Sequence, residues 1–416
     1  MPRRVVVTGM GLLSPMGLDV EQFFSGLGTC KNSIRHMDGW AKYKGLHTCL
    51  AAPIEGFEKP SHYGRKETRS MGRVAILSTY TTELALRDAG LWGEAELQNG
   101  RTGVAYGSSS GSIDSILDFY SMLTNSVTTN VTSSTYIKMM AHTCAVNISV
   151  FLKLTGRLVP TGTACTSGSL AIGNAYELIR NGVQDVMIAG GAEELSPTQA
   201  VVFDTLYATS TKNDAPSLTP RPYDRDRDGL VIGEGAGTVI LEEYERAKAR
   251  GAKIIAEVVG FATNTDGTHV TQPNKDTMAI VIREAIASSG IPASEIGYVS
   301  GHGTATVQGD IAETLATREA FGRTVPISSL KSYIGHTLGA CGAIEAIAAV
   351  EMMNRDWYHP TLNLNNIDPA CGELDYIQGK GRTMQNAFVM SNNFAFGGIN
   401  TSLVFKRTQG FKDRFQ

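Results

Sequence analysis

The stretch Gly162-Thr163-Ala164-Cys165-Thr166-Ser167-Gly168 sets a cysteine among small residues, directly ahead of a helical pattern. In residues 169–182 the apolar positions recur at helical spacing, and Arg180 followed by Gly182 predicts the end of that helix. We therefore expect Cys165 at or beside a helix N-terminus, where free backbone N–H groups stabilise a thiolate and lower the pKa of the thiol. The alternative for this segment is a buried, inert cysteine in a turn of small residues.

The composition limits what kind of protein this is. Its 416 residues predict two domains or two fused halves, and 42% hydrophobic with 19% charged residues is ordinary for a globular chain. A net charge of −3 gives no global signature of nucleic-acid binding. The first apolar run is too short for a signal peptide, and no window approaches the length of a membrane span. Six scattered cysteines without a Cys-x-x-Cys pair predict reduced thiols, so we expect a cytoplasmic protein.

Strands alternate with helices along the whole chain, which predicts an α/β fold with a largely parallel sheet covered on both faces. The order of strand, small-residue loop and helix recurs in both halves and indicates an internal duplication. The predicted strands are 4–8, 102–106, 158–161, 185–189, one that follows a turn within 230–241, 253–260, 296–300, 325–328, 386–391 and 401–406. Besides the helix after Cys165, the predicted helices are 19–28, 73–90, 113–124, 135–155, 242–250, 275–289 and 337–353. The last of them is so rich in Ala, Gly, Ile and Val that it is expected to be buried all round. The alternating Arg/Asp run of residues 221–228 is expected to pair with itself at the surface.

Candidate functional residues follow several of these strands. Cys165, His302 and the segment 394–398 come directly after strands, and Lys331 and His336 follow another after a few residues. Sites in open α/β sheets gather beyond the carboxyl ends of the strands. A cysteine and two histidines are thus expected to converge.

Two other kinds of site fit these residues less well. A zinc site of Cys165, His302 and His336 would lack the usual paired-ligand spacing. A cysteine hydrolase needs one histidine and an orienting Asn or Asp, whereas two histidines and a lysine are present here.

Four sequence motifs, taken in their order along the chain, resemble those of a known protein family. They are Thr163-Ala164-Cys165-Thr166-Ser167, Gly301-His302-Gly303-Thr304-Ala305-Thr306 with Gly309-Asp310, Lys331 through His336 with Gly339, and Asn393 through Asn400. Together they resemble the β-ketoacyl-[acyl-carrier-protein] synthases, the elongating condensing enzymes of thiolase fold, and the similarity spans nearly the whole chain. The resemblance implies a duplicated thiolase-like fold of five αβαβα layers. Residues 1–252 would form the half with the cysteine, and residues 253–409 the half with the histidines and the lysine.

The resemblance also implies roles. Cys165 would be the acyl-accepting nucleophile, and His302 and His336 would stabilise the enolate formed when a malonyl thioester loses carbon dioxide. The backbone N–H groups of Cys165 and Phe396 would form the oxyanion hole, with Phe396 as the gate of the acyl pocket. Lys331 would position this set, paired with Glu345 because an unpaired buried lysine is costly. The further residues implied are Asp310, Glu313 and Phe394 in support, and Thr304, Thr306, Thr271 and Ser110 in the pocket for phosphopantetheine and acyl chain.

The implied reaction is decarboxylative Claisen condensation on carrier-protein thioesters, in fatty acid elongation or in related polyketide or aryl polyene assembly. No metal and no cofactor is implied beyond the phosphopantetheine of the acyl carrier protein. Arg65, Lys66 and Arg69 lie at helical spacing and match the basic face on which the family receives its acidic carrier; a solvated helix face is the alternative. Ala395 and Ser110 depart from the family pattern, so the acyl substrate stays open.

Partners and competing functions follow from the same residues. A homodimer is expected, with a heterodimer of ketosynthase and chain-length factor as the alternative. A thiolase-like, CoA-dependent enzyme would replace one histidine by a second cysteine. A non-catalytic chain-length partner would lack the nucleophile. Both histidines and Cys165 are present here.

Overall fold

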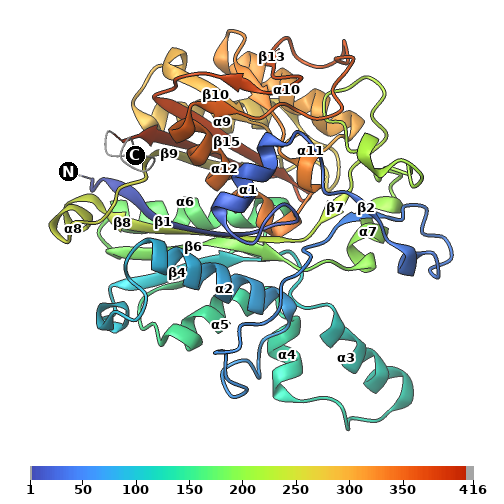
Figure 1. Ribbon diagram of the computed structural model, residues 1–416, viewed down its shortest axis with the longest axis vertical. Coiled ribbons are helices and arrows are strands. Elements are labelled where there is room, and N and C mark those ends of the chain that lie inside the picture. Colours follow the sequence, from blue (N-terminus) through green and yellow to red (C-terminus); the bar gives the residue numbers. More distant parts are fainter. Residues whose placement is uncertain (1, 409–416) are drawn as a thin grey trace.

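The computed structural model describes residues 2–408 and contains one sheet of eleven strands in the order β13-β11-β10-β15-β16-β9-β1-β8-β6-β4-β5 (Figure 1). The strands of the first half are β1 Val5–Leu13, β4 Thr102–Gly107, β5 Leu158–Pro160, β6 Val186–Glu193 and β8 Gly235–Glu243. Those of the second half are β9 Ala256–Thr265, β10 Ile296–Ser300, β11 Pro326–Ser328, β13 Asp375–Tyr376, β15 Phe388–Ala395 and β16 Ile399–Arg407. Small sheets are formed by β2 Arg35–His36, β3 Leu50–Ala52 and β7 Ile232–Gly233, and by β12 Trp357–Tyr358 with β14 Arg382–Thr383.

The two halves repeat one topology, which confirms the predicted duplication. The order β5-β4-β6-β8-β1 of the first half corresponds to β11-β10-β15-β16-β9 of the second, with the same parallel and antiparallel neighbours. The two copies meet where β1 pairs antiparallel with β9 over residues 5–7. Because the copies share one sheet, the division of the chain after residue 252 stays a prediction.

The prediction of a largely parallel sheet is wrong, because each half ends in antiparallel strands. Three strands run parallel in the first half and four in the second, where β13 adds to β11, β10 and β15, and in each half the next strand pairs antiparallel with its neighbour. In the second half, β15 and β16 form a hairpin joined by Phe396-Gly397-Gly398. A connection this short can join only antiparallel strands, since a parallel pair needs a crossover of a dozen residues or more.

The helices complete five layers (Figure 1). α6 and α12 pack on each other in the central layer; α2 and α5 cover the outer face of the first half, and α9 and α10 that of the second. Every residue of α12 from Cys341 to Met353 is buried, as its composition predicted. A Cβ at Gly168 of α6 would lie 2.7 Å from the backbone nitrogen of Ala343, so glycine permits this close approach. The helices are α1 Val20–Gly28, α2 Arg73–Asp88, α3 Asp114–Asn125, α4 Ser133–Met139, α5 Thr143–Leu152, α6 Ser167–Arg180, α7 Pro197–Asp204, α8 Tyr244–Ala249, α9 Lys275–Ser289, α10 Val307–Phe321, α11 Lys331–Ile334 and α12 Cys341–Arg355.

Two helical expectations need correction. The helix expected over 135–155 is two helices, because Met140 is extended, with φ −68° and ψ 139°, and ends α4. Residues 65–72 form turns rather than a helix, and α2 begins only at Arg73. The basic residues in that stretch therefore do not lie on one helical face.

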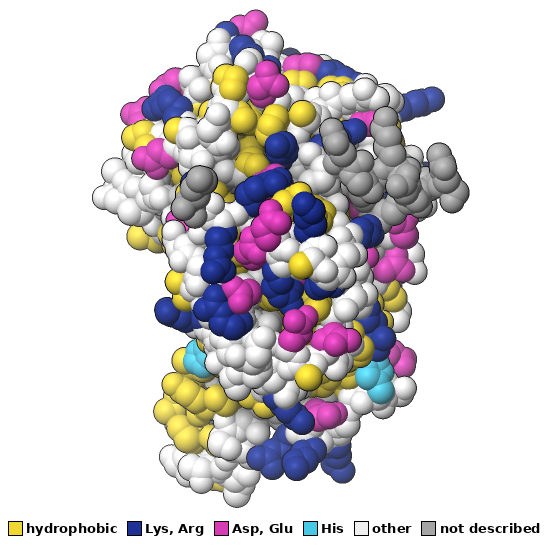
Figure 2. Space-filling model, turned by 90° about the vertical axis from the view of Figure 1, so that its left-hand side faces the viewer, with side chains coloured by type: hydrophobic (Ala, Val, Ile, Leu, Met, Phe, Trp, Pro, Cys, Tyr) yellow, Lys and Arg dark blue, Asp and Glu magenta, His cyan; other side chains and the backbone are white. Residues whose placement is uncertain are grey.

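The surface carries charges of both signs. Figure 2 shows a face on which Lys and Arg side chains alternate with Asp and Glu, in keeping with 37 basic and 40 acidic residues in the chain. Within residues 2–408, no helix combines the length and the apolar character needed to cross a membrane.

Candidate active site

Cys165 lies in a short turn held by hydrogen bonds. The turn Ala164–Thr166 is a single 3-10 turn that leads into α6, and Ala164 has a left-handed φ of 51°. The hydroxyl of Ser167 accepts from the N–H of Thr163 at 3.0 Å and donates to the carbonyl of Ala164 at 2.7 Å. These bonds fix the backbone on both sides of the cysteine, whose side chain is buried.

His336 is the nearest functional neighbour of the thiol. Its Nε2 lies 3.0 Å from the Sγ of Cys165, and its Nδ1 accepts from the N–H of Leu338 at 3.3 Å. Since Nδ1 accepts, the ring proton lies on Nε2, which donates to the sulfur. Burial lowers the pKa of His336 well below its usual value, with the charge of Lys331 as a second cause, so the ring is neutral.

The expectation of a lowered thiol pKa is wrong for this resting state. Burial raises the pKa of Cys165 to about 11, although the charge of Lys331 and the backbone N–H groups of Phe396 and of Cys165 itself lower it. Desolvation of the thiolate outweighs the helix N-terminus because the residue is almost fully covered. Both N–H groups favour the thiolate, and they are the same two donors that the resemblance assigns to the oxyanion hole.

We expect a pH-dependent reactivity of this thiol. Because only the thiolate reacts, alkylation of Cys165 by iodoacetamide should accelerate about tenfold per pH unit between pH 7 and 9, without a plateau below its pKa. Peptide mass spectrometry resolved by residue measures this rate. Cys30, which is partly exposed, is the internal comparison. A rate for Cys165 that is flat above pH 7 would contradict the raised pKa.

His302 is held from behind by a buried ionic network. The Nζ of Lys331 lies 3.1 Å from its Nδ1 and 2.5 Å from Oε1 of Glu345, so the predicted pair of Lys331 and Glu345 is present. Asn393 donates to the other oxygen of Glu345 at 2.6 Å and lies 3.3 Å from the same Nδ1. Two donors at Nδ1 leave the proton of His302 on Nε2. Burial and the charge of Lys331 lower the pKa of His302 well below its usual value, so it is neutral.

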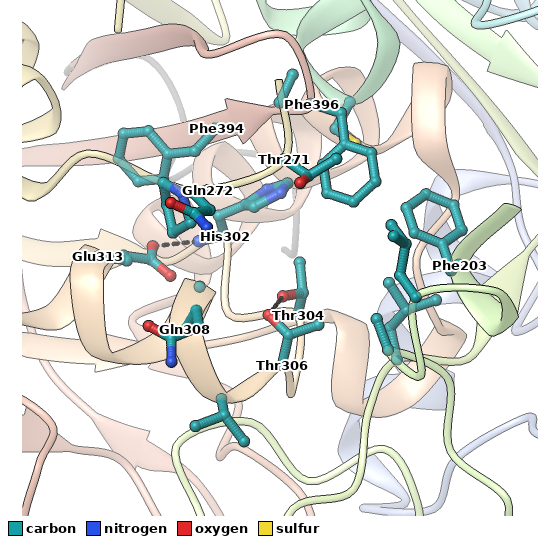
Figure 3. A pocket seen from close by; sticks show the side chains of 18 of the residues that line it. Phe203, Thr271, Gln272, His302, Thr304, Thr306, Gln308, Glu313, Phe394 and Phe396 are labelled. Carbon is teal, nitrogen blue, oxygen red and sulfur yellow. Dashed lines mark hydrogen bonds between the residues drawn. The ribbon is translucent and has the colours of Figure 1, made fainter. Parts of the chain in front are cut away.

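Acidic residues support the loop that carries His302. Glu313 accepts from the N–H groups of His302 and Gly303 at 2.5 and 2.6 Å (Figure 3). Asp310 accepts from the N–H groups of Ala305 and Tyr223 at 3.1 and 2.7 Å. Burial raises the pKa of Glu313 to about 8 and that of Asp310 to about 6. Both residues thus fix backbone rather than face the thiol.

The expectation that the Arg/Asp run pairs with itself at the surface is wrong for Arg227. Its side chain is 1% exposed, pairs with Asp310 and Asp368, and donates to the carbonyls of Thr306 and Val307. A desolvated charge needs charged partners, and here they come from α10, which carries Asp310, and from the segment between β12 and β13, which carries Asp368. Arg227 was missed as a supporting residue because a run of charges is usually solvated.

A cavity of about 570 Å³ opens onto these groups. Cys165, His302, His336, Phe394 and Phe396 lie along it, and so do Thr271, Thr304 and Thr306 (Figure 3). The hydroxyls of Thr304 and Thr306 lie 2.9 Å apart, and the rings of Phe203 and Phe396 pack with centroids 5.1 Å apart. The structure thus brings Cys165, His302 and His336, and three of the four predicted pocket residues, to one cavity. Lys331, the fourth predicted catalytic residue, does not line it and contacts Nδ1 of His302 instead.

The structure places both residues at which the sequence departs from the family pattern, Ser110 and Ala395. Ser110, expected in the pocket wall, lies outside this cavity, with its hydroxyl 3.5 Å from Glu193. Ala395 is the last residue of β15 and pairs with Ile399, so its Cβ is accommodated by an extended backbone. The sharp turn falls instead on Gly397 and Gly398, whose φ values are 89° and 71°.

Asn393 was not singled out as a supporting residue. It is fully buried near the end of β15, beside Asn392. Two adjacent asparagines in a buried strand are unusual, because a buried amide needs a partner. The pair Asn392-Asn393 in the sequence is therefore the signal that could have indicated a supporting role for Asn393.

The predicted carrier-docking residues remain on the surface. Arg65, Lys66 and Arg69 are all exposed, and none of them lines the cavity. Reversing all three to Glu should raise the KM for an acyl carrier protein by about threefold to tenfold at low salt, since exposed charges act through attraction that salt screens. Steady-state kinetics at low and high salt measure the effect. An unchanged KM at low salt would leave these residues as a plain solvated surface.

A metal could in principle be held here. One ligand atom each of Cys165, His302 and His336 lies within 4.8 Å of the others, which is a donor set that suits zinc. Lys331 already lies at Nδ1 of His302, so an added cation would face a buried ammonium. The two neutral rings with Nε2 protons are instead suited to donate hydrogen bonds.

Comparison with known proteins agrees with this site. Residues 2–247 match the family described as "Beta-ketoacyl synthase, N-terminal domain", and residues 255–365 match "Beta-ketoacyl synthase, C-terminal domain". The chain therefore belongs to the β-ketoacyl synthase family.

Individual relatives cover almost the whole chain. The 3-oxoacyl-[acyl-carrier-protein] synthase 2 of Vibrio cholerae is 39% identical over 97% of this chain and 99% of its own. The crystal structure of a β-ketoacyl synthase from Burkholderia phymatum is 56% identical, with a TM-score of 0.96 over 98% of this chain and 100% of that one. The ishigamide ketosynthase/chain length factor is 29% identical, with a TM-score of 0.90 and coverage of 98% and 100%. These values confirm the thiolase-like fold.

Proposed function

We propose that this protein is a β-ketoacyl-[acyl-carrier-protein] synthase that joins an acyl thioester to malonyl carrier protein through an acyl-Cys165 intermediate. The observation that carries the proposal is the set of Cys165 and two neutral histidines with their Nε2 protons directed into one cavity. The family assignment and the relative from Vibrio cholerae support the same reaction.

The first half-reaction transfers the acyl group to the cysteine. The sulfur of Cys165 attacks the thioester carbonyl, the carbon–sulfur bond to the carrier's arm breaks, and the arm leaves as a thiol with the proton that Cys165 gives up. The developing oxyanion receives the backbone N–H groups of Cys165 and Phe396, the same two groups that act on the sulfur in the free protein. His336, which donates to the sulfur, favours the thiolate at the moment of attack.

The second half-reaction forms the carbon–carbon bond. The malonyl thioester releases carbon dioxide, and the electron pair left behind becomes an enolate whose oxygen accepts from the Nε2–H groups of His302 and His336. The enolate carbon attacks the acyl group on Cys165, the carbon–sulfur bond breaks, and the sulfur leaves as a thiolate. This thiolate takes up a proton from water, which restores the resting thiol. Neutral imidazoles suit this role, since a donor is needed and no proton has to move in the first step. Lys331 keeps Nδ1 of His302 occupied and so keeps its donor at Nε2.

The proposal includes a partner and a compartment. The acyl carrier protein presents both substrates on its phosphopantetheine, and no other cofactor or metal takes part. The protein acts as a homodimer, or alternatively as the ketosynthase subunit beside a chain-length factor, as in the ishigamide assembly. We place it in the cytoplasm, because all six cysteines are free thiols, as suits a reducing compartment.

Mass spectrometry tests the function directly. The purified protein is mixed with carrier proteins that bear saturated, unsaturated and aryl acyl chains, and then with malonyl carrier protein. We expect a mass gain on Cys165 and release of a β-ketoacyl carrier after the second addition. The chain that loads fastest identifies the substrate class. Absence of acylation with every chain, in the protein alone and with a co-expressed partner subunit, would overturn the proposal.

A further inference from the structure

A buried carboxylate holds the turn that follows His336. Glu193 is the last residue of β6 and is fully buried. Its Oε2 accepts from the N–H groups of Ser109 at 2.8 Å and Gly339 at 3.0 Å, and its Oε1 accepts from the side-chain amide of Gln199 at 3.1 Å. All three partners are neutral, and burial raises the pKa of Glu193 to about 7. A carboxylate buried among neutral partners is costly, which marks the residue as a candidate for a functional role.

The turn Leu338–Ala340, which Glu193 holds by its middle N–H, is bonded to the active site on both sides. The N–H of its first residue donates to Nδ1 of His336 at 3.3 Å and so keeps the ring proton on Nε2, which lies 3.0 Å from Sγ of Cys165. Directly after the turn, Sγ of Cys341 donates to the carbonyl of Cys165 at 3.1 Å. A shift of this turn would therefore move the donor to the sulfur and the backbone of the nucleophile together.

Close packing fixes the turn on the carboxylate. A Cβ at Gly339 would lie 2.8 Å from the backbone nitrogen of Ser109 and 2.9 Å from Oε2 of Glu193, so no side chain fits there. The same turn packs on β6 and against the turn that carries Cys165. In an interior packed this closely, a change at the carboxylate is transmitted to the turn rather than absorbed by empty space.

The internal repeat gives Glu193 a counterpart in the active site. β4 pairs with β6 as β10 pairs with β15, so the positions two residues beyond the last pair correspond in the two halves. The positions two residues ahead of α12 and of α6 correspond in the same way. The counterparts are Glu193 and Asn393, Ser109 and His302, and Gly339 and Cys165. Glu193 thus bonds, in its own half, the counterparts of the histidine and of the nucleophile, and the arrangement that is reactive on one side is an anchor on the other.

We propose that Glu193 is a positioning residue for the reaction at Cys165: it holds the turn Leu338–Ala340 so that His336 keeps its donor on the sulfur. This inference rests on the proposed function. The carboxylate acts through the N–H of Gly339, so its essential property is an oxygen that accepts there. Glu193→Gln retains such an oxygen and gives up only the bond at Oε1. Glu193→Met, of similar size, has only a weakly accepting sulfur.

The experiment compares these two variants, both of which lack the charge, so a difference between them reports the hydrogen bonds. Acylation of Cys165 is followed with an acyl chain on free pantetheine, and unfolding in denaturant is measured on the same samples. We expect the limiting rate of acylation to stay within about threefold of the wild type in Glu193→Gln and to fall about tenfold in Glu193→Met, because a small misplacement of reacting groups is costly. The half-saturating substrate concentration should be unchanged in both, since Glu193 does not line the cavity.

The tautomer of His336 gives a second measurement that needs no turnover. In protein labelled with ¹⁵N-histidine, the NMR shift of Nδ1 reports whether that nitrogen carries a proton, and His336→Asn identifies the signal. We expect Nδ1 to be unprotonated in the wild type and in Glu193→Gln, and both tautomers to be present in Glu193→Met. Glu193→Asp, which draws the carboxyl back from Gly339, replaces Glu193→Met in both measurements if the latter does not fold.

The next residue along the chain is the matched control. Glu194 is also buried, but it accepts from the N–H groups of Val74 at 3.1 Å and Ile113 at 2.7 Å and from the hydroxyl of Ser112 at 2.8 Å, away from the turn after His336. Glu194→Met should lose stability relative to Glu194→Gln, and the two should acylate alike.

Two results would overturn the role of Glu193. One is an equal acylation rate and an equal His336 tautomer in Glu193→Gln and Glu193→Met. The other is a loss of acylation in Glu194→Met as large as that in Glu193→Met, which would show an effect of lowered stability alone. A wild-type protein that is not acylated would instead overturn the proposed function, and the tautomer of His336 would still test the contact that Glu193 makes.

Discussion

Replacement of Cys165 by alanine is expected to abolish condensation, with a loss of at least about a thousandfold, because no other group in the variant can take over covalent catalysis. The same variant should still release carbon dioxide from malonyl carrier protein. That step depends on the Nε2–H groups of His302 and His336, which the substitution leaves in place. Removal of the sulfur takes away one acceptor of His336 and leaves its Nδ1 bonded to the N–H of Leu338. Product formation by mass spectrometry and carbon dioxide release from labelled malonyl carrier measure the two activities separately.

A neighbouring thiol provides the control for this prediction. Cys341 is buried, and its Sγ lies 3.1 Å from the carbonyl oxygen of Cys165. Cys341→Ser should retain acylation, and the acyl group should remain on Cys165. Condensing activity retained by a folded Cys165→Ala variant, or an acyl group found on Cys341, would contradict the assignment of the nucleophile.

Lys331→Met is expected to have the second largest effect, on both catalysis and stability. Glu345 then loses its cation in a fully buried place, and breaking such a pair costs about 3–5 kcal/mol of folding free energy. Without the ammonium at Nδ1, His302 is free to carry its proton on either nitrogen, so the donor toward the enolate is lost in part of the molecules. We expect decarboxylation of malonyl carrier to fall about 10²-fold or more. Acylation of Cys165, which does not use His302, should fall less.

A double variant separates the two effects. Lys331→Met with Glu345→Gln removes both charges, so stability should recover toward that of the wild type, since an uncharged pair leaves no orphaned ion. Decarboxylation should stay low, because Nδ1 of His302 still lacks its cationic partner. Chemical denaturation and carbon dioxide release measure the pair of outcomes. Recovery of decarboxylation together with stability would show that Lys331 acts only through the fold.

The convergence of the site could be predicted because its residues follow strands. Cys165 comes after β5, His302 after β10, and Lys331 and His336 after β11. β10 and β11 are parallel neighbours, so the loops that follow them lie at one edge of the sheet. β5 belongs to the parallel strands of the other half, and Cys165 reaches the histidines because its turn packs against β15 and α12. The burial of α12 could also be predicted from the sequence, because an unbroken run of small and apolar residues leaves the helix no polar face.

Other parts of the structure could not be predicted, for physical reasons. α10 was missed because Asp310 and Glu313 are buried in it as acceptors for loop N–H groups, and this breaks the apolar stripe of a covered helix. The antiparallel strands β8 and β16 have the same kind of apolar run as the parallel strands. The hydropathy pattern therefore does not predict whether two strands pair parallel or antiparallel. The raised pKa of Cys165 follows from how fully the fold covers the thiol, which local sequence does not record.

The repeat of one topology in both halves has a consequence for how the site could have arisen. Each half offers a loop after its central parallel strand and a turn ahead of its central helix. The turn ahead of α6 carries Cys165, and the loop after β10 carries His302; the loop after β4 carries serines instead. A chain of half this length, assembled as a symmetric pair, would have to place the same residue at both equivalent positions. Fusion of the two copies removes that constraint, so one copy supplies the nucleophile, the other supplies the hydrogen-bond donors, and the twin positions are left to diverge.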